Sequence, residues 1–388
     1  MFTCETLTMS LMKPAHFLAE LIALPSVNPA FLPAGDPRAG EHRVADFLAA
    51  TAARGGLDVE FHEVTPNRRN LIARFTPSGR VKKRVVLAPH TDTVGDLGMS
   101  DRLFQPEIRN GRLYGRGACD TKGSVASMLM AVLSLALQGR RPATTEIIFA
   151  GLIDEENSQL GSRALVRSGF KADLAIVGEP TQLQVVTAHK GDLWLKVTTR
   201  GKSAHGAKPH LGKNAIHSMA QIINLIETDY ATTLKNQSHP LLGQATVNVG
   251  SIRGGTQPNI VPDWCEISID RRTLPGETSA SVLRGLRKFL VKHGLKATIN
   301  DSKGAPAPSL ETNPRLPLVQ ALLASVGQNS TVGVDYFCDA AILAAGGIPS
   351  VVFGPGDIAQ AHTATEWISV RQLDQAVAQL VGFLRSLP

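Results

Sequence analysis

The chain has 388 residues, 43% of them hydrophobic and 19% charged, a composition that excludes a disordered or fibrous protein. At about 150 residues per domain, this length allows two or three domains. The 40 Lys and Arg residues exceed the 33 Asp and Glu residues, so the net charge is +7. Such an excess is compatible with nucleic acid, an anionic membrane surface or acidic small molecules as partners.

Four cysteines, far apart and without a CxxC pair, exclude a disulfide scaffold and a cysteine-ligated zinc site. The first 24 residues lack a basic start followed by an apolar core, and the longest uncharged apolar run, 124–137, is too short to cross a bilayer. We therefore expect a cytoplasmic protein with no membrane contact. Aromatic residues are only 5% and no recognition signature is present, so nucleic acid is not an expected partner.

Five short runs rich in Val and Ile predict strands that are buried on both faces, as in a sheet sandwiched by helices. They cover residues 70–75, 84–88, 145–153, 173–177 and 349–353. Helices are predicted over 121–137 and near the C-terminus, where apolar residues recur with helical spacing from Leu373 to Leu384. This order predicts an α/β fold with a mostly parallel sheet flanked by helices.

The middle of the chain predicts a second domain of a different kind. Its elements are a strand at 189–200, a helix at 214–226, strands at 245–252 and 264–270, a helix at 279–293 and a strand at 296–300. This β-α-β-β-α-β order is typical of a ferredoxin-like α+β domain. We expect residues 187–302 to be inserted into a discontinuous first domain made of 1–186 and 303–388. Residues 187–300 hold 15 Lys and Arg but 7 Asp and Glu, so the positive excess lies there.

Histidines and carboxylates follow the predicted strands of the first domain, at the sheet edge where parallel sheets bind ligands. They are His90, Asp92, Asp120, Glu155, Glu156, Glu179 and His362. Imidazole and carboxylate without thiolate suit zinc, cobalt or manganese. Two histidines and three carboxylates are too many for one four-coordinate zinc and predict two ions, about 3.5–4 Å apart, with a bridging carboxylate.

Two further residues of this set have predicted roles beside the ligands. In an extended backbone Asp92 shares a side with His90 and can fix the tautomer of that ring. Glu155 adjoins a ligand without being needed as one, which suits a general base for the attacking water.

Each of these residues alone has a simpler explanation. A His-x-Asp pair is commonly a surface pair, Glu155-Glu156 a solvated helix start, and Asp120 a helix cap. Cys119 as a nucleophile has no partner motif. Glycine patterns that mimic a dinucleotide fingerprint and a P-loop each lack a required glycine. The placement of all the candidates after successive strands favours the metal site.

At this point the sequence resembles a known family. The blocks APHTDTV, GRGACDTKG, IDEEN, VGEP, GKSAHGA and FGPGDIAQAHTATEW resemble, in this order, the di-metal amidohydrolases that include acetylornithine deacetylase, succinyl-diaminopimelate desuccinylase and bacterial glutamate carboxypeptidase. The similarity spans nearly the whole chain after about residue 12, and acetylornithine deacetylase-like deacylases are most similar. It implies a zinc-exopeptidase-like domain with an inserted lid and dimerisation domain, a homodimer through that domain, and two divalent ions, zinc first and cobalt or manganese otherwise.

The resemblance also implies a ligand set by position. His90, Asp120 and Glu179 would hold one ion. Asp120, Glu156 and His362 would hold the other, with Asp120 as the bridge.

Other roles are carried over in the same way. Glu155 would be the acid/base and Asp92 the support of His90. In the inserted domain His205 would stabilise the oxyanion, and in dimeric relatives this histidine comes from the partner subunit. Asn259 and Arg271 match substrate-binding positions, the arginine being suited to a carboxylate. The alternatives are a turn residue for Asn259 and a surface ion pair for Arg271.

We therefore expect metal-dependent hydrolysis of the amide bond of N-acyl amino acids, as in acetylornithine deacetylases, with water activated by two metal ions. The partner would be a small N-acyl amino acid or a short peptide. A dipeptidase or carboxypeptidase, or a succinyl-diaminopimelate desuccinylase, is the alternative on the same site. A non-catalytic relative would lack Glu155 or a ligand, and here all are present.

Overall fold

The computed structural model describes residues 13–95 and 101–388 and divides the chain into two compact units. The first unit comprises the chain up to Thr187, Thr312–Val332 and Cys338–Pro388, and the second unit comprises Ala188–Glu311 and Gly333–Phe337. The second unit thus contains most of the segment predicted as an insertion, together with a short later segment. In the part of the chain that is described, none of the helices has the length and apolar character needed to span a membrane.

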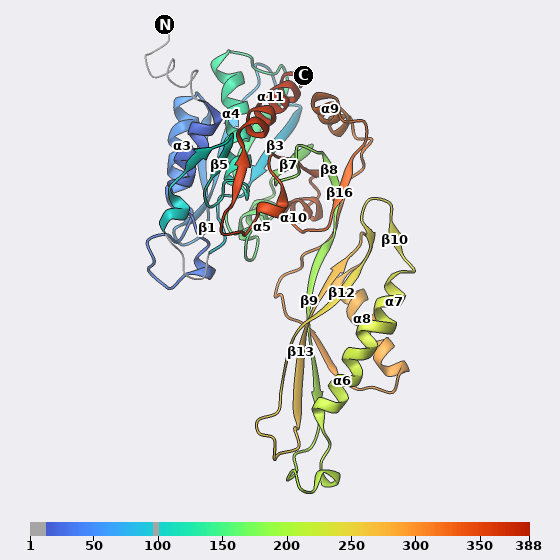
Figure 1. Cartoon of the computed structure of the whole chain (residues 1–388). Helices are drawn as coiled ribbons and strands as arrows, with labels where there is room; N and C mark the ends of the chain where they lie inside the picture. Colours follow the sequence, from blue (N-terminus) through green and yellow to red (C-terminus); the bar gives the residue numbers. More distant parts are fainter. Residues whose placement is uncertain (1–12, 96–100) are drawn as a thin grey trace. The chain divides into compact units, whose positions relative to one another are not determined.

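The largest sheet has nine strands in the order β1-β2-β6-β3-β7-β17-β8-β15, with β16 beside β8. Figure 1 labels β1, β3, β7, β8 and β16 of this sheet. The strands are β1 (Asp58–Thr65), β2 (Arg68–Phe75), β3 (Lys83–Pro89), β6 (Thr145–Gly151), β7 (Leu174–Gly178), β8 (Val186–His189), β15 (Leu310–Glu311), β16 (Val332–Val334) and β17 (Ser350–Val352). The central strands β6, β3, β7 and β17 are parallel, and β1, β2, β8 and β15 pair antiparallel. The predicted mostly parallel α/β sheet is confirmed, and all five apolar runs lie in it.

Helices cover both faces of this sheet because its strands are apolar on both sides. One layer contains α2 (Pro14–Ile22), α3 (His42–Arg54), α4 (Lys122–Leu137), α9 (Pro317–Val326) and α11 (Val370–Arg385), and the other contains α5 (Leu160–Arg167) and α10 (Asp339–Ala345). Val85 and Leu87 of β3 point into the first layer, as alternation along a strand requires. Helix α4 contacts α2 and α11 as well as the sheet, which explains why its sequence is apolar nearly all round.

The loops of the first unit contain several short helices and strands. They are η1 (Pro29–Phe31), η2 (Asp101–Phe104), β4 (Glu107–Arg109), β5 (Arg112–Tyr114), η5 (Ile358–Gln360) and β18 (Trp367–Ser369). Strands β18, β5 and β4 form a small sheet in that order, in which Trp367 pairs with Tyr114. This pairing brings two loops together that are distant in the sequence.

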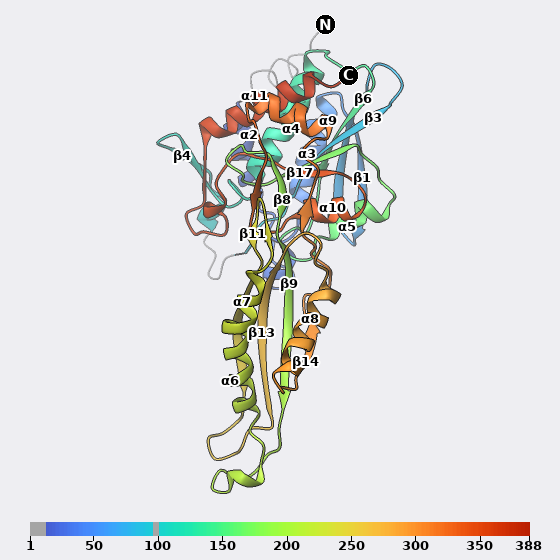
Figure 2. The same cartoon turned by 90° about the vertical axis from the view of Figure 1, so that its right-hand side faces the viewer.

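The second unit is built around a four-stranded antiparallel sheet in the order β12-β13-β9-β14. Its elements are β9 (Gly191–Arg200), η3 (Pro209–Leu211), α6 (Ala215–Leu225), the π-helical η4 (Ile226–Tyr230), α7 (Ala231–Leu234), β10 (Ser238–His239), β11 (Gly243–Gln244), β12 (Thr246–Gly254), β13 (Trp264–Thr273), α8 (Ser279–Lys292) and β14 (Thr298–Asp301). Helices α6 and α8 pack on one face of the sheet, where they share a core with Leu195 and Ile267. Figure 2 shows both helices beside β9 and β13. This is the predicted ferredoxin-like arrangement.

Candidate metal centre

Three parallel strands deliver acidic and histidine side chains to one edge of the large sheet. His90 follows β3 directly, Glu155 and Glu156 come shortly after β6, and Glu179 follows β7. Because β6, β3 and β7 are parallel neighbours, their carboxyl ends meet at the same edge. Asp120 joins them from the loop before α4.

Two groups of ligand atoms form at this edge, and Asp120 belongs to both. The first group is His90, Asp120 and Glu179, the second is Asp120, Glu156 and His362, and in each the ligand atoms lie within 4.8 Å of one another. His90 Nε2 is 3.1 Å from Asp120 Oδ1, while His362 Nε2 is 3.2 Å from Asp120 Oδ2. Each carboxylate oxygen of Asp120 therefore faces one histidine, an arrangement in which the carboxylate can bridge two ions.

Two buried carboxylate oxygens at this centre lack a hydrogen-bond partner among the described residues. They are Oε1 of Glu156 and Oε1 of Glu179. The other oxygen of Glu156 lies 3.2 Å from His362 Nε2. Burying a carboxylate oxygen without a donor costs free energy that a cation would offset. The number of ligand residues, their nitrogen and oxygen donors and the unpartnered carboxylate oxygens therefore all fit two divalent metal ions.

The two histidines are both shifted toward the protonated form. Burial alone would lower the pKa of His90, but hydrogen bonds to Asp120 and Asp92 outweigh it and raise that pKa well above the usual value. Hydrogen bonds to Asp120 and Glu156 raise the pKa of His362 to about 10. A histidine binds a metal ion only through a deprotonated ring nitrogen. Metal ions at this site would therefore displace a proton from each of the two rings.

The carboxyl groups are crowded with negative charge. Burial and the neighbouring Glu179 raise the pKa of Glu155 well above its ordinary value. Burial and Asp120 raise the pKa of Glu156 to about 7, and burial also raises the pKa of Glu179. Shifts of this kind mark a site that stabilises positive charge or carries protons.

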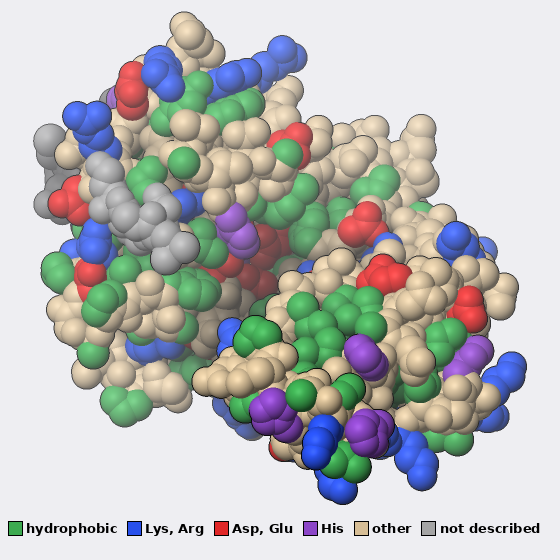
Figure 3. Space-filling model, turned by 60° about the horizontal axis from the view of Figure 1, so that its bottom comes forward, with side chains coloured by type: hydrophobic (Ala, Val, Ile, Leu, Met, Phe, Trp, Pro, Cys, Tyr) green, Lys and Arg blue, Asp and Glu red, His purple; other side chains and the backbone are tan. Residues whose placement is uncertain are grey.

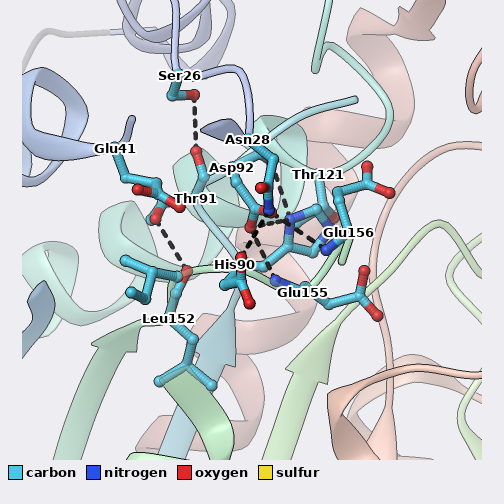
Figure 4. A network of polar contacts seen from close by, with 12 residues as sticks. Ser26, Asn28, Glu41, His90, Thr91, Asp92, Thr121, Leu152, Glu155 and Glu156 are labelled. Carbon is cyan, nitrogen blue, oxygen red and sulfur yellow. Dashed lines mark hydrogen bonds and ion pairs between the residues drawn. The ribbon is translucent and has the colours of Figure 1, made fainter. Parts of the chain in front are cut away.

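Asp92 lies where the sequence predicted, beside His90, and has more contacts than predicted. His90 Nδ1 is 3.4 Å from Asp92 Oδ1 and 3.0 Å from the Asp92 carbonyl oxygen. The same carboxylate accepts the backbone N–H groups of Glu155 at 3.1 Å and Glu156 at 3.2 Å, while both glutamate side chains extend away from it (Figure 4). Asp92 thus orients a ligand ring and the loop after β6 together.

A buried polar network behind Asp92 was missed by the sequence analysis. Asn28 Nδ2 donates to Asp92 Oδ2 at 2.8 Å (Figure 4). The same Nδ2 also donates to Asp154 Oδ1 at 2.9 Å. Arg68 continues the network by donating to Asp154 and to the buried Glu41. Asn28 precedes a proline and caps η1, so its local sequence indicates only a turn.

The site reaches the surface at His362, whose side chain is 56% exposed. Figure 3 shows acidic side chains gathered beside a histidine on one face of the molecule. His362 has φ of 61° and Asp154 has φ of 67°, in the left-handed region that non-glycine residues rarely adopt. Such conformations cluster at functional sites.

The three predicted residues of the second unit have different surroundings. His205 and Asn259 are exposed and their loops are joined, since Gly206 N–H donates to the Asn259 carbonyl oxygen at 2.7 Å. Ala207 N–H donates to His205 Nδ1 at 3.1 Å, which leaves the proton of the neutral ring on Nε2. Arg271 is 1% exposed, and its Nη2 lies 2.6 Å from Glu277 Oε1.

Strand periodicity in β13 is the signal that places Arg271. Ile267 and Ile269 alternate with polar residues, so Arg271 falls on their face, the face covered by helices. The next residue, Arg272, points to the opposite face and pairs with Asp270.

The three described cysteines are free and buried. Burial raises the pKa of Cys119, which keeps its thiol protonated. This environment supports a packing role for Cys119 rather than a nucleophilic one.

Comparisons with known proteins agree with this chemistry. The family model "Peptidase family M20/M25/M40" matches residues 86–386. The acetylornithine deacetylase of Vibrio cholerae is 31% identical over 353 residues, covering 87% of this chain and 88% of that protein. The acetylornithine deacetylase of Myxococcus xanthus is 34% identical over 348 residues, covering 86% and 89%.

Solved structures share the fold. The aminopeptidase PepT of Bacillus cereus superimposes with a TM-score of 0.77 at 22% identity, covering 96% of this chain and 97% of that one. An M20 family metallo-carboxypeptidase of Sulfolobus solfataricus gives 0.74 at 20% identity, covering 97% and 99%. A dinuclear metal binding M20 peptidase of Bacillus subtilis gives 0.67 at 16%, covering 95% and 96%.

Proposed function

The chain belongs to peptidase family M20/M25/M40, and from this premise we propose that it removes the acyl group of N-acyl amino acids, with N-acetylornithine as the first candidate substrate. It is a metal-dependent amide hydrolase, and a peptidase activity is compatible with the same relatives. The observation that carries the proposal is the pair of ligand groups that share Asp120.

We assign two divalent ions to these groups. His90, Asp120 and Glu179 would hold one, and Asp120, Glu156 and His362 the other. The nitrogen and oxygen donors suit zinc, with cobalt or manganese as alternatives. When bound, such ions lower the pKa of water and polarise the scissile carbonyl.

Glu155 moves the proton in this proposal. Its carboxylate takes a proton from the attacking water as the C–O bond forms, and returns that proton to the nitrogen of the leaving amine as the C–N bond breaks. The products are a carboxylic acid and an amine. Burial raises the pKa of Glu155, which makes its carboxylate a stronger base for the proton of the water and supports this role.

His205 would stabilise the negative charge that develops on the carbonyl oxygen. The contact from Ala207 supports a ring that donates from Nε2. We propose that this histidine is supplied by the partner subunit of a homodimer formed through the second unit. Asn259, on the loop joined to that of His205, and Arg271 stay proposed substrate contacts. A substrate carboxylate that reached Arg271 would compete with Glu277 for it.

The role of Glu155 is tested by Glu155→Gln. We expect this variant to keep the metal content of the wild type but to lose about 10²–10⁴-fold in kcat, the usual contribution of a general acid/base. Metal content is measured by plasma mass spectrometry, and the exposed Glu107→Gln is the matched control. Wild-type turnover by Glu155→Gln would overturn the assignment.

The substrate class is tested by one panel of compounds: N-acetylornithine, other N-acetyl amino acids, N-succinyl-diaminopimelate and a dipeptide. We expect the highest kcat/KM for an N-acetyl amino acid. We also expect that dialysis against a chelator abolishes turnover of this substrate and that added zinc or cobalt restores it. A higher kcat/KM for the dipeptide would make the protein a peptidase, and full activity of metal-free protein would reject the metal centre.

A further inference from the structure

Glu366 is a buried carboxylate next to the metal centre that neither the sequence analysis nor the proposed mechanism uses. The residue is 2% exposed. Its Oε1 accepts the backbone N–H groups of Cys119 at 2.8 Å and Asp120 at 2.9 Å. Its Oε2 accepts Gly117 N–H at 2.9 Å and Arg116 Nη1 at 2.9 Å. Four donors from one short loop therefore converge on a single carboxylate.

The backbone of the loop 116–120 has a conformation that lets these N–H groups point at one carboxylate. Gly117 has φ of 82°, and a Cβ there would lie 2.9 Å from the side chain of Thr93 and 3.0 Å from that of Lys122. A side chain at this position would have no room and would disfavour the conformation. Neighbouring N–H groups in such a turn form a concave anion site. Here the anion is Glu366, and the loop that it holds ends at Asp120.

The same pair also reaches the segment that carries the second histidine. Arg116 Nη1 donates to the carbonyl oxygen of Thr363 at 3.3 Å, and Thr363 directly follows His362. The backbone N–H of Gly115 donates to the carbonyl oxygen of Glu366 at 3.1 Å. Arg116 and Glu366 thus join the loop of Asp120 to the loop of His362.

We propose that Glu366 is a positioning residue for the metal centre. Together with Arg116 it fixes the backbone of Asp120, whose carboxylate is shared by both ligand groups. The pair also holds the segment that follows His362, and His362 is a member of the second group only. This inference rests on the proposed function, because it takes Asp120 and His362 to be metal ligands. Neighbours that orient metal ligands typically change metal affinity by about 10–100-fold when they are replaced.

A carboxylate is required at this position, and an isosteric amide is not equivalent. A Gln at 366 would offer one acceptor oxygen to the four donors. Its NH₂ group would face N–H groups, which are donors and cannot accept a hydrogen bond. The loop would have to move to relieve these contacts, and Asp120 would move with it.

The inference is tested on Glu366→Gln by titrating metal-free protein with Co²⁺, followed by calorimetry and by the visible absorption of bound Co²⁺. We expect at least one Co²⁺ per chain to bind about tenfold or more weakly than in the wild type, with a changed absorption band. Glu277→Gln is the matched control, because Glu277 also accepts from a buried arginine and from a backbone N–H, that of Leu274, within the second unit. We expect the control to bind Co²⁺ as the wild type does.

Thermal unfolding of the metal-free proteins separates a loss of stability from a loss of positioning. Folded Glu366→Gln with wild-type Co²⁺ affinity and spectrum would overturn the inference, whatever its melting temperature. If Glu366→Gln does not fold, Arg116→Lys replaces it, since lysine keeps the charge but lacks the planar guanidinium whose Nη1 donates to both Glu366 and Thr363. Weakened Co²⁺ binding by folded Arg116→Lys supports the inference, and wild-type binding overturns it. A wild-type chain that bound no Co²⁺ would overturn the proposed function and this inference with it.

Discussion

Asp92 connects His90, a proposed metal ligand, to the loop of Glu155, the proposed general base. One carboxylate faces the ring of His90 and the backbone N–H groups of Glu155 and Glu156. Its orientation depends on Asn28, whose Nδ2 atom lies between Asp92 and Asp154. An amide donor between two buried carboxylates reduces their repulsion and satisfies an oxygen of each. Asn28 therefore acts on the site through Asp92 and Asp154 and has no direct contact with the proposed metal ligands.

Replacement of Asn28 by Ala is expected to lower the free energy of unfolding of the metal-free protein by about 2–4 kcal/mol, because two hydrogen bonds to buried charged groups are lost. Urea denaturation measures this change. Asn28→Asp should be more damaging, since it adds a third carboxylate to the pair. The exposed Asn236→Ala serves as control and should change stability by less than about 0.5 kcal/mol. If Asn28→Ala lowered the free energy of unfolding no more than the control does, the network would not stabilise the protein.

At the scale of elements, α4 begins with a lysine, Lys122, that is fully buried. Lys122 Nζ donates to the carbonyl oxygens of Leu21 at 2.9 Å and Leu24 at 2.7 Å, at and just beyond the end of α2. These contacts join the start of α4 to the end of α2. Burial lowers the pKa of Lys122 to about 7, so the folded protein holds a neutral amine there in mildly alkaline solution.

This burial predicts a stability that depends on pH. Between pH 7 and 10.5 the unfolded chain keeps the Lys122 proton while the folded chain has lost it, so folding releases a proton and stability rises with pH. We expect the melting temperature of the metal-free wild type, relative to that of Lys122→Met, to increase from pH 7 to pH 10. The variant lacks the titrating amine and cancels the contribution of all other groups. A constant difference would show that the amine is protonated in both states.

At the scale of the whole molecule, the positive charge is unevenly distributed along the chain. The net charge of +7 arises from the segment 187–300, where Lys and Arg exceed Asp and Glu by eight. Solvated helix faces account for part of it, since Arg284 and Lys288 of α8 are exposed. The remainder is available to attract anionic acyl-amino acids to an enzyme whose ligand groups are themselves acidic.

Electrostatic attraction of substrate predicts a dependence on salt. We expect kcat/KM for an anionic N-acetyl amino acid to fall as NaCl rises from 50 to 500 mM, because screening shortens the reach of the positive charge. The kcat should stay constant, and the kcat/KM of an uncharged amide of the same compound should change little. A kcat/KM that is equally flat for both substrates would exclude steering.

Much of the fold and of the ligand groups follows from sequence alone. The apolar runs of β3, β6 and β7 identify buried strands by their composition, and parallel strands end at one edge, so the residues after them come together. The prediction of a site from His90, Glu156 and Glu179 needs only these two rules. The ferredoxin-like unit follows in the same way from the order of its strands and helices.

Tertiary structure decided which residues hold that site in place. Asn28 and Asp92 are 64 positions apart, and Glu366 and Asp120 are 246 apart. Contacts of this kind have no periodic pattern, because a hydrogen bond between two loops depends on where the packed sheet brings their backbones. Hydrophobic periodicity determines which elements form, whereas the satisfaction of buried polar groups is settled only once those elements have packed.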